Sequence, residues 1–161
     1  MKRDPRYNTV AARGSAEKRK GERSDCTVRA LQNWLGIDYD EAWDILFEAG
    51  RRDGRGFSVP QLMFHLEKEY GIEAKGNHPR PVIKTRVRRC HCQVWGDPYL
   101  SEEQVALHAT LAQFIRDNPT GNYYVANHNH AFVIKDGKVY DSNQTSMRTR
   151  IHIAYRLVSE M

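Results

Sequence analysis

Apolar side chains recur three or four positions apart in four stretches of the chain, which is the spacing of one face of an α-helix. Three of these stretches begin with a capping-box pattern, a polar capping residue followed three positions later by Glu or Gln. The three pairs are Asp38 with Glu41, Ser58 with Gln61, and Ser101 with Gln104. The pattern predicts helices over residues 26–35, 38–49, 58–70 and 101–115.

The C-terminal third has a different texture, in which short runs of β-branched and aromatic residues alternate with turn signals. These runs predict strands over 123–126, 131–134, 139–140 and 151–158. Residues 72–95 also contain several β-branched residues and predict further short strands. Helices followed by an antiparallel sheet indicate an α+β fold.

One turn in this region sets a register. Asp136-Gly137 between two apolar runs is the dipeptide of a two-residue hairpin loop, so the two lysines that flank it should pair. Counting outward from that pair, and because side chains alternate faces along a strand, His130 shares one face with Asp141 and Asn143. The hairpin therefore places a histidine beside polar partners on the neighbouring strand.

Charge is distributed unevenly along the 161 residues. The net charge is +5, and residues 1–24 hold eight basic and three acidic side chains, whereas the remainder holds 17 of each. Residues 1–23 contain few large apolar side chains, so we expect a flexible basic arm followed by a single domain over 24–161. The arm offers a nucleic-acid contact through Lys18, Arg19 and Lys20 as one interpretation.

The composition also limits the setting in which the protein works. There is no apolar run of the length that spans a bilayer, and no apolar segment follows the N-terminal Met-Lys-Arg, so we expect neither a membrane protein nor a secreted one. Three cysteines cannot all pair within one chain, which favours a reducing cytoplasm, the bacterial host's if the gene belongs to a phage. Cys90-His91-Cys92 cannot complete a tetrahedral zinc site alone, and we expect a surface strand there, with no metal and no cofactor.

Cys26 is the candidate nucleophile. It falls in the first turn of a predicted helix, where unpaired backbone N–H groups and the helix dipole lower the pKa of a thiol. A cysteine on an early helix, a histidine on a later strand and an Asp or Asn after it form the order needed for an activated-thiolate acyl-transfer site.

Two segments resemble the small papain-like cysteine peptidases common in phage and bacterial genomes. Ser24–Leu31, with the following Gly36–Ala42, resembles their cysteine-bearing helix, and His130–Ser142 resembles the strand pair that carries their catalytic histidine and its partner. The resemblance implies a papain-like fold in which the N-terminal helical part precedes the antiparallel sheet. It also implies Cys26 as nucleophile, His130 as general base and then acid, and Asp141 as the residue that orients His130, with Asn143 as the alternative.

The resemblance further implies an oxyanion hole made by the Cys26 backbone N–H and one side-chain donor. The glutamine that usually supplies this donor is absent, because Lys20 stands six positions before the cysteine. The candidate donors are then Ser24, Asn129 and Gln144. His128 shares the face of His130 and is the alternative general base.

We therefore expect a cysteine-nucleophile hydrolase or acyl-transfer enzyme, a peptidase, isopeptidase or amidase, that acts on a peptide or protein through a thioester. The alternative is a catalytically weak or inactive papain-like protein of phage or bacteria. In that case the basic arm, together with residues 75–92, would bind nucleic acid or a protein partner.

Overall fold

The computed structural model describes residues 7–9, 25–52, 56–76, 79, 82–90, 99–128, 130–141 and 145–158. The helices are α1 (Cys26–Leu35), α2 (Tyr39–Ala49), α3 (Val59–Tyr70) and α4 (Leu111–Asp117). The strands are β1 (Tyr7–Thr9), β2 (Ala74–Gly76), β3 (Val82–Cys90), β4 (Tyr99–Leu107), β5 (Asn122–Ala126), β6 (Ala131–Lys135), β7 (Lys138–Asp141) and β8 (Ile153–Leu157). Helices and a largely antiparallel sheet confirm the predicted α+β class.

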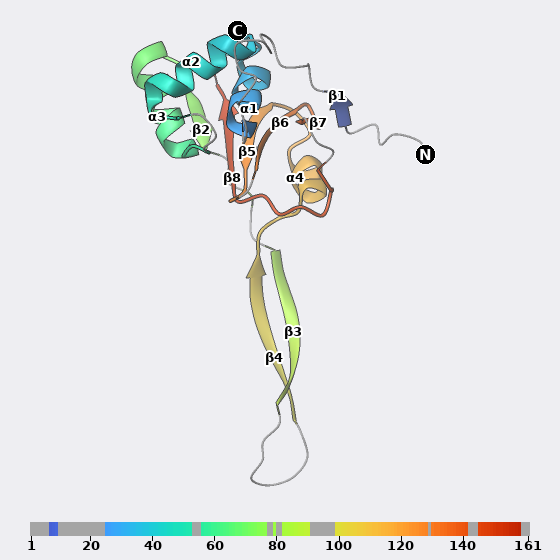
Figure 1. The fold of residues 1–161 in the computed structure, drawn as a ribbon. Coiled ribbons are helices and arrows are strands. Elements are labelled where there is room, and N and C mark those ends of the chain that lie inside the picture. The colour runs from blue at the N-terminus through green and yellow to red at the C-terminus, as the bar shows by residue number, and fades with distance from the viewer. Residues whose placement is uncertain are drawn as a thin grey trace.

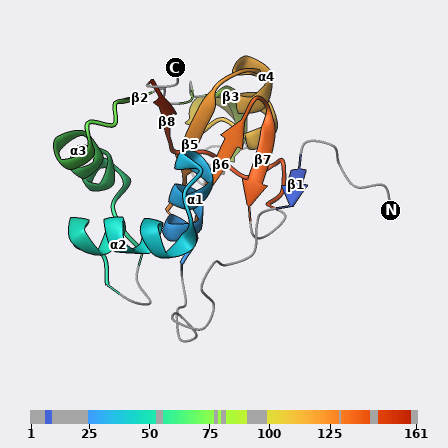
Figure 2. The same ribbon diagram turned by 90° about the horizontal axis from the view of Figure 1, so that it is seen from above.

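A six-stranded sheet in the order β1-β7-β6-β5-β8-β2 forms the centre of the fold. Its pairs are antiparallel, except that β1 runs parallel to β7. Helices α1, α2 and α3 pack on one face and α4 packs on the other (Figures 1 and 2). Because both faces of the sheet are covered, all five residues of β5 are buried. The strand therefore lacks the alternation of apolar and polar residues that is typical of a sheet with one face in water.

The boundaries predicted for the first three helices agree with the structure, although Ser58, at the start of α3, makes no side-chain capping hydrogen bond. The Asp38 side chain accepts a hydrogen bond from the Glu41 backbone N–H at 2.8 Å, which is one half of the capping box. Helix α1 ends at Gly36, whose φ of 68° lies in the left-handed region that glycine adopts without steric cost. Local sequence therefore determines where these helices begin and end.

The prediction of one helix over 101–115 is wrong in its first half. Residues 99–107 form β4, which pairs along its whole length with β3 in a two-stranded ribbon that projects from the body (Figure 1). Helix α4 begins only after Thr110, whose side chain accepts a hydrogen bond from the Gln113 N–H at 3.2 Å. Val105 and Leu107 stand two positions apart, a strand spacing, and pairing with β3, the strand just before β4 in the chain, outweighs the capping pattern at Ser101.

The predicted register of the β6–β7 hairpin is confirmed. Lys135 pairs with Lys138 and Ile134 with Val139. Asp136 and Gly137 have φ values of 48° and 78°, and positive φ at both central positions is what a type I′ turn requires. The register of the hairpin therefore follows from two adjacent residues.

Strand β1 comes from the segment expected to be a flexible arm. Its three residues pair with Val139, Tyr140 and Asp141 of β7, so the segment adds an edge strand to the sheet at this point. Lys18, Arg19 and Lys20 lie outside the described residues.

Buried hydrogen bonds seat α1 on the sheet. Asn122 donates from Nδ2 to the Trp34 carbonyl at 2.7 Å, and Trp34 Nε1 donates to the Asn122 carbonyl at 3.2 Å. At the other end of the helix, the Tyr124 hydroxyl donates to the Thr27 carbonyl at 3.3 Å. Burial and the nearby Cys26 raise the pKa of Tyr124, so its hydroxyl keeps the proton that it donates.

We expect Asn122→Ala to lower the free energy of unfolding by about 1–3 kcal/mol, because it leaves the buried Trp34 carbonyl without its donor. Urea denaturation followed by circular dichroism measures this loss. The matched control is Asn33→Ala, at a half-buried position of α1, which should change stability by less than about 0.5 kcal/mol. Equal effects of the two substitutions would contradict this account of how α1 is anchored.

Candidate active site

Cys26 is the first residue of α1 and is half-buried. The first hydrogen bond of the helix runs from the Arg29 N–H to the Asp25 carbonyl at 3.0 Å, so the preceding N–H groups have no partner within the helix. The groups close enough to act on the sulfur are the His130 side chain and the backbone of Ala131 and Thr27. These groups all favour a negative charge on sulfur.

The electrostatics at Cys26 combine two opposing effects. Burial raises the pKa of the thiol, since it removes water from the charged form. The hydrogen bond and positive charge of His130, together with the backbone of Ala131 and Thr27, lower it and outweigh burial. The net result is a Cys26 pKa below the usual value for cysteine, which favours the reactive thiolate.

His130 immediately precedes β6, between Cys26 and Asp141. Its Nε2 lies 2.8 Å from each carboxylate oxygen of Asp141, so Nδ1 is the ring nitrogen left to face the thiol. The hydrogen bond to Asp141, followed by the one to Cys26, raises the pKa of His130 to about 10, despite the opposing effect of burial. The ring is therefore an imidazolium at neutral pH, and its positive charge favours the thiolate form of Cys26.

Asp141 ends β7, and its side chain is only 3 % exposed. Besides His130, its carboxylate accepts a short hydrogen bond from the Thr145 hydroxyl. A buried carboxylate that is held by two partners keeps one orientation, and here that orientation determines which ring nitrogen of His130 faces the thiol.

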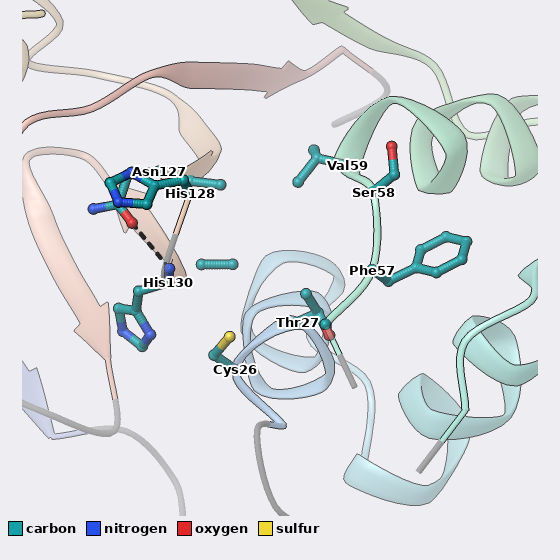
Figure 3. Close-up of a pocket in the computed structure, with 11 residues that line it drawn as sticks. Cys26, Thr27, Phe57, Ser58, Val59, Asn127, His128 and His130 are labelled. Atoms are coloured by element: carbon teal, nitrogen blue, oxygen red, sulfur yellow. Dashed lines mark hydrogen bonds between the residues drawn. The ribbon is translucent and has the colours of Figure 1, made fainter. Parts of the chain in front are cut away.

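Asn127 holds the backbone of His130 in place. Its Oδ1 accepts a hydrogen bond from the His130 N–H at 2.9 Å, and its own N–H donates to the His130 carbonyl at 3.0 Å (Figure 3). Its Nδ2 also donates to the Arg150 carbonyl at 3.4 Å. Asn127 thus ties the approach to β6 to the segment before β8.

A cleft of about 340 Å³ opens above Cys26 and His130. One wall is Gly56–Val59, which leads into α3, and the opposite wall includes Asn127 and His128 at the end of β5 (Figure 3). Val59 points from this wall towards the cleft, whereas the Phe57 ring points away from it (Figure 3). The cleft therefore gives a substrate access to the sulfur of Cys26.

The structure brings together Cys26, His130 and Asp141 from three separate elements. His128, the alternative base, lies on the cleft wall and stacks on His152, with 5.4 Å between ring centroids. The alternative orienting residue Asn143 and the candidate oxyanion donors Ser24, Asn129 and Gln144 lie outside the described residues.

Sequence reasoning missed two residues of the site, Thr145 and Asn127. A hydroxyl four positions after the orienting acid has no local signature, so nothing in the chain marked Thr145. Asn127 had a weak signal, since an asparagine three positions before a strand residue can accept that residue's N–H in a turn. The wall at 56–59 was also missed, because only tertiary packing brings it to Cys26.

The described residues contain no group of three or more His, Cys, Asp or Glu side chains placed to hold a metal ion. Cys90 ends β3, whereas His91 and Cys92 lie outside the described residues. In the same part of the chain, no helix has the length and apolar content needed to cross a membrane.

The fold and site define an α+β protein in which a half-buried cysteine lies beside a histidine that is hydrogen-bonded to a buried aspartate. No protein-family model matches the chain, and no curated protein or solved structure matches it either. Its function must therefore be argued from the site.

We expect Asp141→Asn to move the pH dependence of Cys26 alkylation upward. The carboxylate keeps His130 protonated until the pH rises through about 10; without this negative charge the pKa of His130 falls, and the pKa of Cys26 rises in turn. The rate of alkylation by iodoacetamide should reach half its plateau about one pH unit or more higher than in the wild type.

The matched control is Asp136→Asn, which makes the same carboxylate-to-amide change in the turn of the same hairpin. Asn tolerates the positive φ at this position. Its pH profile should overlay the wild-type profile, and an unchanged profile for Asp141→Asn would contradict the assigned role of the carboxylate.

Proposed function

We propose that the protein is a cysteine-nucleophile hydrolase of the papain-like type, which cleaves an amide or ester through a thioester on Cys26. The observation that carries the proposal is that His130, held by Asp141 at 2.8 Å, lies beside Cys26 on one cleft and lowers the pKa of its thiol. A buried carboxylate, an imidazolium and a thiol of lowered pKa are together the groups required to activate a thiolate.

In the acylation step, the Cys26 thiolate attacks the carbonyl carbon of the substrate and forms a C–S bond. The C–N bond then breaks, and the His130 imidazolium gives its Nδ1 proton to the leaving amine. The products are an amine, a thioester on Cys26 and a neutral His130 whose orientation Asp141 maintains.

In the deacylation step, neutral His130 removes a proton from water as the water oxygen attacks the thioester carbonyl. The C–S bond breaks, the acid is released, and the thiolate–imidazolium pair forms again. If another amine takes the place of water, the same steps give acyl transfer.

Negative charge develops on the carbonyl oxygen in both steps. The N–H of Cys26 lies at the start of α1 among groups that the helix leaves unpaired, so it is the donor that we assign to the oxyanion. The positive end of the α1 dipole favours the same charge.

An acyl-enzyme measurement tests the proposal. With p-nitrophenyl acetate, we expect a burst of p-nitrophenol and one acetyl group per chain, located on Cys26 by mass spectrometry of peptides. Cys26→Ser and His130→Gln should each lower the burst rate about 10³-fold or more, because Cys26 is the nucleophile and His130 keeps it ionised.

The control is the double substitution Cys90→Ser and Cys92→Ser, which removes the other thiols of the chain and should leave the burst intact. Acetylation of Cys90 or Cys92 as fast as that of Cys26, or a Cys26→Ser protein with a full burst, would refute a nucleophilic Cys26.

A further inference from the structure

Three imidazole rings form a stack beside the cleft. His152 lies against His108 with ring centroids 4.0 Å apart and planes at 28°, and against His128 at 5.4 Å and 25°. His108 follows β4, His128 follows β5, and His152 precedes β8. His128, at one end of the stack, lines the same cleft as Cys26 and is exposed.

Backbone hydrogen bonds hold the three segments together. The Ile151 N–H donates to the Ala109 carbonyl at 2.9 Å, and the His152 N–H donates to the Ala126 carbonyl at 3.1 Å. Thr110 and Arg150 form an antiparallel bridge next to these bonds. The rings therefore extend from anchored backbone positions into one stack.

The charged groups beside this stack differ from those beside His130 and His65. His130 has Asp141 as its carboxylate partner, and His65 Nε2 lies 3.7 Å from a Glu48 carboxylate oxygen. The groups that act on His152 are instead the two neighbouring rings, and the nearby charged side chain is Arg150, whose Nη1 donates to the His108 carbonyl at 2.7 Å. The described residues thus provide this cluster with basic groups and no carboxylate.

The stack can hold one positive charge more readily than two. Two protonated rings 4.0 Å apart would repel each other. Burial, followed by His108 and His128, lowers the pKa of the central His152. The central ring is therefore the least favourable position for a positive charge, and His128 is the end of the stack that reaches the cleft.

We propose that the stack of His108, His152 and His128 is a pH-gated subsite for a carboxylate of the substrate that binds in the Cys26 cleft. This inference rests on the proposed function for the existence of a substrate. A carboxylate matches the single positive charge that the stack can hold, and histidine is the side chain whose charge changes between about pH 5 and pH 8.

The charge of His130 does not interfere with a measurement between pH 8 and pH 6. His130 keeps its proton until about pH 10, so its charge is constant between pH 8 and pH 6. Ionisation of Cys26 affects anionic and neutral alkylating reagents alike. The ratio of the two alkylation rates therefore reports the added positive charge in the cleft.

The experiment compares alkylation of Cys26 by iodoacetate and by iodoacetamide at pH 8 and pH 6, on the full-length protein, with the site of labelling checked by mass spectrometry. In the wild type, the ratio of the iodoacetate rate to the iodoacetamide rate should rise about threefold to tenfold at pH 6, as one charge near the sulfur predicts. His128→Gln should abolish the rise, and His65→Gln, on α3, should retain it.

His128 is exposed, so its substitution should leave folding intact, and thermal unfolding of each variant verifies this. A wild-type ratio that is the same at both pH values, or a rise that persists in His128→Gln, overturns the subsite. The iodoacetamide rate alone tests the proposed function separately, because an ordinary slow rate at pH 6 would show that Cys26 is not an activated thiol, whatever the ratio does.

Discussion

The hydrogen bond between His130 Nε2 and the Asp141 carboxylate is the interaction on which the rest of the site depends. It directs Nδ1 towards Cys26 and raises the pKa of the ring, and the charged ring in turn lowers the pKa of the thiol. The bond exists only because the β6–β7 hairpin has its particular register. A slip of one residue would turn the histidine and its partner to opposite faces of the sheet.

The second requirement is that the start of α1 meets this hairpin. Asn122 and Trp34 fasten the end of the helix to β5, and Tyr124 contacts its first turn through Thr27. Helices on both faces bury the central strands, so the sheet is a rigid base for both halves of the site. The thiol, the ring and the carboxylate are thereby held in place, which is what the proposed function requires of them before a substrate binds.

Histidines serve two electrostatic purposes in this molecule. His130 is partnered by an acid and keeps its proton across the neutral range, whereas His152 lies between two other rings and loses its proton more readily. The difference arises from the neighbouring residues, since the side chains are chemically identical. The net charge of +5 contributes little to either case, because all of it belongs to residues 1–24 and the remaining residues hold equal numbers of basic and acidic side chains.

Sequence alone determined the features that depend on neighbouring residues. Asp136-Gly137 decided the hairpin register, and Asp38 with Glu41 decided where α2 begins, because turns and caps involve residues only a few positions apart. Tertiary structure decided what depends on distant contacts. The resemblance of two short segments suggested that Cys26 and His130 meet, but it is the packing of α1 on the sheet that brings them together. The strand over 99–107 was missed for another reason: its partner β3 is its neighbour in the chain, but the capping pattern at Ser101 gave a competing local signal. Thr145, Asn127 and the stack of three imidazoles also depend on tertiary structure. No local sequence pattern predicts that the segments they connect lie close together.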